Sequence, residues 1–362
     1  MSISNSVFNF TSFYNPSALE QNESPFRKSP LTEEEAFAKM VKNSRKALLE
    51  HKAIEAPLLN RQSSVYASLE DLSFLGSSEP FAPPPLQFTT FTASAQGSRG
   101  TMEDVSFISS IPNGIVTGVL DGHHGDKVAT FASAKFKEIF PNVLEQTQGH
   151  VHRALEVTSG IIQKEILLDS SMNGMGSTAV FSVFDPIKHQ VITTTIGDSE
   201  ANIYRKKEGQ VFSIPLSCVR DWTSKKDEAR ARTAHNDPRY FSCFNRFNQK
   251  VAGWNFVPKS SKDRYLTSND KLYETNVSRA FGKAAYAGSC THKGKTTISG
   301  LKKDDIVVIA SDGLKDHKEA DIVNIVAQSS LENLSQALVN YAIAKPGSDN
   351  VSVVVIHASE IL

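Results

Sequence analysis

The stretch IVTGVLDGHHGDKVA, residues 115–129, shows the pattern on which the fold depends. A run of β-branched and apolar residues ends at Asp121-Gly122, and a helical stretch begins a few residues later. Such runs favour β-strands, and Asp-Gly pairs are typical of the turns that end them. Six more runs of this kind occur, namely TTFTASAQ (89–96), VSFISSI (105–111), TAVFSVFD (178–185), QVITTTIGD (190–198), DIVVIASD (305–312) and VSVVVIHA (351–358).

Longer helical stretches lie between groups of these predicted strands, at about 126–147, 151–169, 223–233, 318–328 and 331–344. Because the strands come in groups with paired helices between the groups, the order favours an α+β layered fold over a doubly wound parallel sheet. The segment from about 209 to 278 does not follow this pattern of grouped strands and paired helices. Its central part carries more Lys and Arg than Asp and Glu. That excess predicts either a solvated charged face or a surface for an anionic ligand.

Residues 1–88 differ in composition from the rest of the chain, because they are rich in Ser, Asn and Pro. Thr32 followed by Glu35 is typical of a capping box, and the apolar residues after it have helical spacing. We therefore expect a partly disordered N-terminal arm with one helix near 32–52, followed by a single domain over 89–362. The helix either packs on that domain or binds a partner.

The composition is that of a globular protein, with 362 residues of which 40% are hydrophobic. Lys and Arg number 39 and Asp and Glu also 39, so no net charge draws the chain to nucleic acid or to an anionic membrane. Three scattered cysteines fit neither a disulfide framework nor a CxxC zinc site, which favours a reducing compartment. The sequence lacks a signal peptide and a membrane span. These features predict a cytoplasmic protein, and they are also compatible with an exported bacterial effector.

Acidic residues stand at the ends of several predicted strands. Glu103 and Asp104 precede one strand, Asp121 and Asp312 each end another, and Asp349 comes just before the last. Carboxylates gathered at one edge of a sheet repel one another unless cations neutralise them, and Mg²⁺ or Mn²⁺ prefers such oxygen ligands. The pattern therefore indicates a metal site, although each of these residues taken alone also fits a turn.

Seven segments, taken together and in order, carry a resemblance to a known family. They are GSRGTMEDVSF, GVLDGHHGDKVA, GMGSTAVFSVF, TIGDSEANIYR, NVSRAFGKAAY, VVIASDGLKDH and GSDNVSVVVI. In this order they resemble the metal-dependent protein phosphatases of the protein phosphatase 2C family. The resemblance implies a four-layer α-β-β-α sandwich, in which two antiparallel sheets are flanked by helix pairs. It also implies hydrolysis of phosphoserine and phosphothreonine by a water molecule that two metal ions activate.

The same resemblance assigns the metal ligands residue by residue. Asp121 corresponds to the carboxylate that bridges both ions, and the Gly122 carbonyl and Glu103 correspond to ligands on one side. Asp312 and Asp349 correspond to ligands of the other ion. Two ions that share a water lower its pKa, so no protein nucleophile is needed. The expected cofactors are two Mg²⁺ or Mn²⁺ ions per chain.

The resemblance also implies catalytic roles for two further residues. Arg99, four residues before Glu103, corresponds to the arginine that binds the phosphate, and a guanidinium can bind two phosphate oxygens at once. Its alternative role is a surface salt bridge with Glu103 or Asp104. His123 corresponds to the histidine that protonates the leaving alkoxide, and its alternative role is to order the loop or a metal-bound water. Thr178 and Asp198, in the GSTA and GDS motifs, are interpreted as packing and turn elements.

Some positions depart from the family pattern. Asn173 stands where many relatives carry an Asp that helps to hold a third ion, so a third ion is expected to bind poorly. His124 replaces a Gly and Lys283 replaces an Asp. The family's flap corresponds to a hard-to-align segment near 217–277.

These departures leave a second hypothesis, in which the chain is a catalytically weak relative that serves as a binding scaffold. A two-metal phosphodiesterase is a third reading, but the neutral charge and the lack of a stacking motif argue against nucleic acid. The expected partner is a phosphoprotein substrate, and the resemblance implies a monomer.

Overall fold

A computed structural model describes residues 84–236, 254–258, 264–268, 274–282, 290–315 and 317–360. The helix expected near 32–52 and Lys283 lie outside the described residues, as does the expected N-terminal arm except for its last five positions. The first strand begins at Leu86, three residues before the start expected for the domain.

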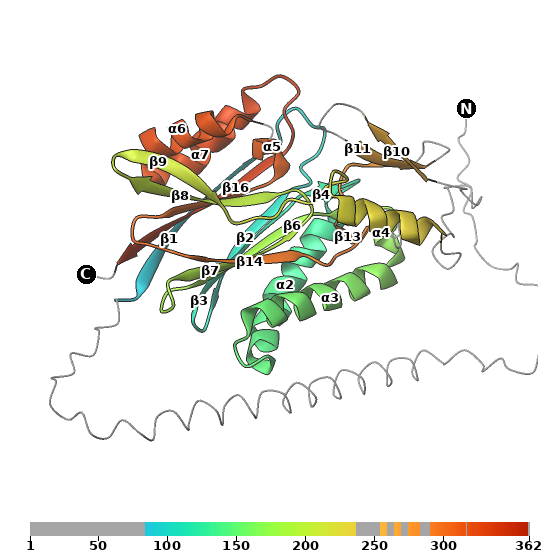
Figure 1. Cartoon of the computed structure of the whole chain (residues 1–362), viewed down its shortest axis with the longest axis horizontal. Helices are drawn as coiled ribbons and strands as arrows, with labels where there is room; N and C mark the ends of the chain where they lie inside the picture. The colour runs from blue at the N-terminus through green and yellow to red at the C-terminus, as the bar shows by residue number, and fades with distance from the viewer. Residues whose placement is uncertain are drawn as a thin grey trace, which may run out of the picture. The chain divides into compact units, whose positions relative to one another are not determined.

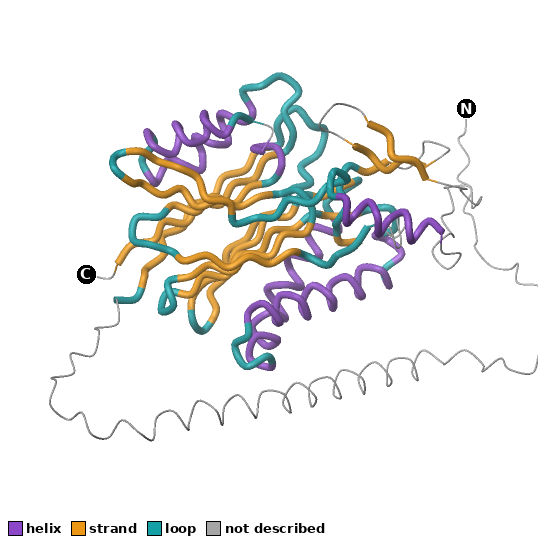
Figure 2. Tube along the Cα trace, viewed as in Figure 1, coloured by secondary structure: helices purple, strands orange, loops and turns teal. Residues whose placement is uncertain are grey.

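Two five-stranded antiparallel sheets stack at the centre of the domain (Figures 1 and 2). The first, here called the β16 sheet, has the order β1 (Leu86–Ala95), β16 (Val351–Glu360), β15 (Ile306–Ala310), β8 (Glu200–Lys207) and β9 (Gln210–Pro215). The second, the β3 sheet, has the order β14 (Lys295–Gly300), β7 (Gln190–Ile196), β6 (Ala179–Asp185), β3 (Gly114–Leu120) and β2 (Val105–Ile111).

Helix pairs cover the two outer faces of this stack, as Figure 2 shows. Helices α2 (Lys127–Gln146) and α3 (Val151–Leu168) pack on the β3 sheet, and α6 (Glu319–Gln328) and α7 (Leu331–Ile343) pack on the β16 sheet. The layers therefore run helix, sheet, sheet, helix. This confirms the α+β class and the four-layer arrangement that the grouped strands and the family resemblance predicted.

The central strands are buried on both faces, which explains their almost continuous apolar composition. In β16, Val354 and Ile356 point into the core between the sheets, whereas Val353 and Val355 point toward α7. This alternation follows from the two-residue period of a strand. All seven predicted strands are present, and each of the five predicted helices lies within three residues of its expected bounds.

Shorter elements complete the end of the sandwich near α4 (Lys225–Asn236). Three two-residue strands, β13 (Phe281–Gly282), β5 (Gly176–Ser177) and β4 (Gly122–His123), form a small sheet in that order. A second small sheet contains β10 (Trp254–Pro258), β11 (Arg264–Ser268) and β12 (Glu274–Thr275). The 3-10 helix η2 (Ser170–Met172) precedes β5, and the short α5 (Asp312–Lys315) follows β15.

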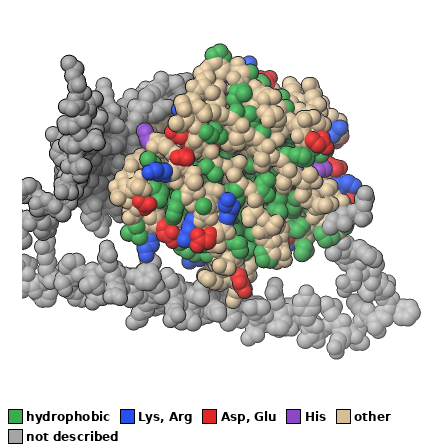
Figure 3. All heavy atoms as spheres, turned by 180° about the vertical axis from the view of Figure 1, so that it is seen from behind, with side chains coloured by type: hydrophobic (Ala, Val, Ile, Leu, Met, Phe, Trp, Pro, Cys, Tyr) green, Lys and Arg blue, Asp and Glu red, His purple; other side chains and the backbone are tan. Residues whose placement is uncertain are grey.

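The surface agrees with the balanced charge of the sequence. On the face drawn in Figure 3, acidic and basic side chains are interspersed among apolar and polar ones. Within the part of the chain that the structure describes, no helix is both long enough and apolar enough to cross a membrane.

Candidate metal and phosphate site

One edge of the sandwich collects acidic residues from both sheets. Strands β3, β7 and β15 end at this edge, whereas β2, β8 and β16 begin there, because neighbouring strands are antiparallel. The loops at these strand ends carry six carboxylates, those of Glu103, Asp104, Asp121, Asp198, Asp312 and Asp349. The topology therefore brings together all four carboxylates that were predicted as metal ligands.

Asp121 and Asp312 form the centre of this cluster and share a side-chain hydrogen bond. The pKa of Asp312 is raised to about 8, mainly by loss of hydration and then by the charges of Asp198 and Asp349. Loss of hydration, followed by the charge of Asp312, raises the pKa of Asp121 well above its usual range. Without cations, this pair therefore retains a proton at neutral pH.

Asp104 lies beneath the pair and is 7% exposed. Its Oδ2 accepts a hydrogen bond of 2.6 Å from Ser311 Oγ, whereas its buried Oδ1 accepts no well-formed hydrogen bond from the described residues. Burial raises the pKa of Asp104 to about 6, although the hydroxyls of Ser311 and Ser352 oppose that rise. A buried carboxylate oxygen without a donor fits a neighbouring cation or its bound water.

Asp198 has a role beyond the turn assigned to it from the sequence. It lies in the bend between β7 and β8, is 4% exposed, and its negative charge helps to raise the pKa of both Asp121 and Asp312. Its carboxylate therefore belongs to the acidic cluster. The Gly-Asp pair that follows β7 was visible in the sequence, but its neighbour Asp312 lies more than 100 residues away along the chain.

The residues around Asp121 fix its backbone in place. Asp121 N donates to Thr178 Oγ1 at 3.2 Å, and Thr178 N donates back to the Asp121 carbonyl at 2.9 Å. Gly122 N donates to the Glu103 carbonyl at 3.2 Å, and a Cβ at Gly122 would lie only 2.6 Å from that oxygen. Thr178 thus positions Asp121, and Gly122 permits the close approach of the Glu103 loop. His123 follows in β4, and its ring Nδ1 is buried.

Asn350 holds the loop that carries Arg99 and Glu103. Its Oδ1 accepts from Glu103 N at 2.7 Å, and its Nδ2 donates to the carbonyls of Gln96 at 2.7 Å and Thr101 at 2.9 Å. The sequence analysis did not single out this residue. Its position next to Asp349, before a buried strand, was the available signal.

Arg99 contacts a different partner from the two considered in the sequence analysis. Its Nη2 donates to Asp349 Oδ2 at 2.5 Å, rather than to Glu103 or Asp104. The Arg99 side chain is 60% exposed and that of Asp349 34% exposed. Exposed ion pairs contribute only about 0–1 kcal/mol, so this contact is easily exchanged for another anion.

The carboxylates of the acidic edge suit divalent cations, although they do not already surround a metal position. Among the described residues, no three His, Cys, Asp or Glu side chains already stand together at metal-binding spacing. Instead the pKa values of Asp121 and Asp312 are raised, which favours a bound proton, and Arg99 pairs with Asp349. A hard cation with oxygen ligands can take the place of both positive charges. Asn173, at the end of η2, is exposed and brings no charge.

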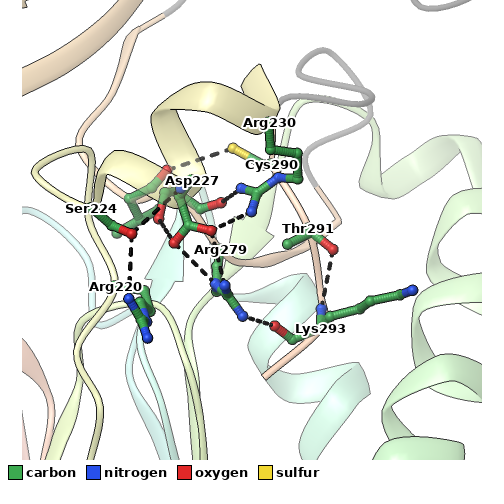
Figure 4. A network of polar contacts seen from close by, with 10 residues as sticks. Arg220, Ser224, Asp227, Arg230, Arg279, Cys290, Thr291 and Lys293 are labelled. Carbon is green, nitrogen blue, oxygen red and sulfur yellow. Dashed lines mark hydrogen bonds and ion pairs between the residues drawn. The ribbon is translucent and has the colours of Figure 1, made fainter. Parts of the chain in front are cut away.

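Another buried carboxylate, that of Asp227, anchors the segment predicted to be the flap (Figure 4). Asp227 of α4 is fully buried, and its two oxygens accept from Arg279 Nη2 at 2.9 Å and Nε at 3.2 Å, from Ser278 Oγ at 3.1 Å, and from Arg230. Burial by itself would raise the pKa of Asp227, but the hydrogen bond to Arg279 and the two positive charges hold it below its usual range.

This network, which we call the Asp227 anchor, connects the flap to the small sheet at the acidic edge. Arg279 lies two residues before β13, which pairs with β5, and β5 pairs with β4. Part of the basic excess near the flap is therefore used internally. Arg230 binds the buried Asp227, and its Nη2 also donates to the Ser278 carbonyl at 2.8 Å.

Comparisons with known proteins agree with this geometry. The sequence matches the protein phosphatase 2C family over residues 91–351. It is 25% identical over 292 residues to protein phosphatase 2C homolog 3 of Schizosaccharomyces pombe, which corresponds to 73% of this chain and 63% of that protein. Protein phosphatase 2C homolog 2 of the same yeast is 26% identical over 72% of this chain and 70% of its own length. The chain thus spans less than two thirds of homolog 3.

Solved structures share the fold. A serine-threonine phosphatase 2C from Toxoplasma gondii superimposes with a TM-score of 0.62 at 15% identity, covering 77% of this chain and 98% of that one. A Caenorhabditis elegans sex-determining protein gives a TM-score of 0.58 at 19% identity, over 74% of this chain and 64% of that one. The family match extends from β1 to the first residue of β16 and therefore includes every residue of the acidic edge, so the chain belongs to the protein phosphatase 2C family.

Proposed function

We propose that this protein is a Mg²⁺- or Mn²⁺-dependent serine/threonine protein phosphatase. The observation that carries the proposal is the meeting of six carboxylates at one edge, where Asp121 and Asp312 have strongly raised pKa values. Such a cluster is costly unless cations neutralise it. Membership of the protein phosphatase 2C family supports the reaction class.

The proposed ligands follow from the loops that hold them. Asp121 would bridge the two ions, with Glu103 and the Gly122 carbonyl on one side and Asp312 and Asp349 on the other. Ions bound in this way supply a water molecule of lowered pKa for attack on phosphorus. Asp104 and Asp198 stand behind the ligands and add negative charge, which favours retention of cations.

Arg99 is proposed to bind the phosphate group of the substrate. Its exposed guanidinium stands beside Asp349, where it can exchange that carboxylate for two phosphate oxygens. The same positive charge offsets the negative charge that develops on the phosphoryl group. The exposed ion pair with Asp349 therefore marks the place at which the phosphate would be received.

His123 is proposed to protonate the leaving oxygen of the serine or threonine. It lies next to Gly122 in β4, at the acidic edge, and is partly buried. Imidazole is the side chain that most often serves as a general acid or base in enzymes. No serine or cysteine nucleophile is required in this arrangement.

The test is phosphate release from a phosphothreonine peptide and from an aryl phosphate, with Mn²⁺, with Mg²⁺ and with EDTA, beside the variant Asp312→Ala. We expect phosphate release that depends on the added metal and is lost both in EDTA and in Asp312→Ala. No release from a folded protein under any metal would instead support the scaffold hypothesis, with His124, Asn173 and Lys283 as the departures to revert.

A further inference from the structure

A pocket of about 240 Å³ lies between strands β8 and β9 and the beginning of α6. Figure 1 shows these three elements side by side, and α6 packs on β9. The side chains that give the pocket its chemistry are those of Glu200, Asn202, Tyr204, Ser213, His317 and Glu319. None of the residues that line it is a lysine or an arginine.

The alternation of β8 explains why polar groups face this pocket. Ala201 and Ile203 point into the core between the two sheets, so Glu200, Asn202 and Tyr204 point outward on the opposite face. The pocket also begins at the acidic edge. Glu200 is paired with Ala310, two residues before Asp312.

Tyr204 is the residue that indicates a ligand. It is 4% exposed and lines the pocket, yet its hydroxyl makes no hydrogen bond to any described residue. An N–H donor bound in the pocket would supply the hydrogen bond that this oxygen lacks among the described residues. Burial raises the pKa of Tyr204 above its usual value, and the charges of Glu200 and Glu319 raise it further, so the hydroxyl is neutral.

Glu319 is held at the rim of the same pocket. Ser213 Oγ donates to its Oε1 at 2.5 Å, which restrains the carboxylate. Glu200 and Glu319 place two carboxylates among the lining residues, and both lie near enough to Tyr204 to raise its pKa. A guanidinium or ammonium group offers several N–H donors and a positive charge, and therefore matches these acceptors.

We propose that this pocket receives an arginine or lysine side chain of the phosphoprotein substrate. The inference rests on the proposed function, because the substrate's phosphate must lie at the acidic edge for its neighbouring residues to reach the pocket. From Glu200 to Tyr204 the strand advances about 13 Å, which equals about four residues of an extended peptide. The basic residue is therefore expected within about four positions of the phosphorylated residue.

The experiment compares phosphothreonine peptides that carry a single Arg or Ala at each of the four positions on either side of the phosphothreonine. The readout is the ratio of kcat/KM for the Arg peptide to that for the Ala peptide, measured with Mn²⁺. At one or two positions we expect this ratio to be about 10, since a charge-assisted hydrogen bond contributes that much to affinity. Glu319→Lys should bring the ratio to 1 or below, and Tyr204→Phe should lower it in part.

Glu332→Lys, an exposed acidic position on α7, is the matched control and should leave the ratio unchanged. A wild-type ratio near 1 at every position would overturn the proposal. A ratio that survives both Glu319→Lys and Tyr204→Phe would also overturn it, because the preference would then arise elsewhere.

An aryl phosphate, which has no neighbouring side chain, separates this inference from the proposed function. Turnover of the aryl phosphate without an Arg preference contradicts only the pocket, whereas no metal-dependent turnover contradicts the phosphatase itself. If there is no metal-dependent turnover, fluorescence anisotropy still tests whether the pocket binds the peptide. The labelled Arg peptide should bind more tightly than the Ala peptide in EDTA, and Glu319→Lys should remove the difference. Equal binding would overturn the pocket assignment.

Discussion

The Asp227 anchor and the acidic edge both remove carboxylates from water, and they compensate for the lost hydration differently. The Asp227 anchor surrounds one fully buried carboxylate with Arg230, Arg279 and Ser278, and the pKa of Asp227 stays low. The acidic edge brings six carboxylates together, and the pKa of Asp312 rises to about 8. Positive charge is built into the first site, whereas the second retains protons and an exposed arginine. The difference agrees with a structural role for the anchor and with our proposal that the edge binds cations.

The largest effect on activity is expected for Asp121→Asn. The asparagine keeps the shape of the protonated side chain but cannot bridge two ions, so kcat/KM should fall by about 10³-fold or more. The melting temperature in EDTA should hardly change, because the raised pKa of Asp121 already disfavours its charged form there. Phosphatase assays and calorimetry on the same preparation measure both quantities. Activity close to that of the wild type would show that the chemistry lies elsewhere.

Asp227→Asn should have the opposite profile. Removing this charge leaves Arg230 and Arg279 without their buried counter-ion, so we expect a loss of about 3–5 kcal/mol in the free energy of unfolding. Denaturant titration measures it, and Glu156→Gln is the control. Glu156 pairs with Arg153 at the surface, where both side chains are 59% exposed, and its change should cost less than about 1 kcal/mol. Equal losses in the two variants would erase the distinction between a buried and a surface pair.

Arg99→Ala should weaken the reaction with little effect on folding. Loss of a charged phosphate contact is expected to lower kcat/KM for a phosphopeptide by about 10- to 100-fold, mainly through KM. The effect on an aryl phosphate should be smaller. Arg153→Ala, which removes another exposed arginine, is the matched control. If the peptide and the aryl phosphate lose activity equally, Arg99 does not clamp the phosphate.

The smallest effect concerns pH. The folded-state pKa values of Asp104, about 6, and Asp312, about 8, are raised above those of the unfolded chain. The folded state therefore binds more protons than the unfolded state, and these groups make the metal-free protein less stable as the pH rises from about 4 toward 8. A thermal melt in EDTA should show a melting temperature that falls as the pH rises across this range. Saturating Mn²⁺ should remove or reverse the fall, and a melting temperature that rises with pH in EDTA would contradict the assignment.

Much of the fold could be predicted from the sequence because its central strands are buried on both faces. Runs such as VSVVVIHA are apolar throughout, and the helices repeat with the usual spacing. Strands β8, β9 and β14 were not predicted, because they carry charged or polar residues among apolar ones, as in EANIYRKK and KTTISG. The two-residue strands β4, β5 and β13 are too short for any periodic signal, and pairing across the fold alone defines them.

The candidate site divides in a similar way. Its acidic residues stand beside strand ends, so their motifs and their meeting at one edge could be predicted. Their partners could not be predicted, because these partners come from distant segments. Arg99 contacts Asp349, and Asn350 holds Glu103, across about 250 residues of sequence. The charge on Asp198 and the arginines around Asp227 likewise become meaningful only when the chain has folded.

The most direct test of the central claim is calorimetric titration of Mn²⁺ into the EDTA-treated and dialysed protein, in two buffers that differ in ionisation enthalpy. The comparison of the two buffers counts the protons that leave as the metal binds. We predict binding of two ions with release of protons near pH 7, and loss of that binding in Asp121→Asn but not in Glu156→Gln. Absence of binding, or binding that Asp121→Asn leaves intact, would contradict the claim that the acidic edge is built to exchange protons for cations.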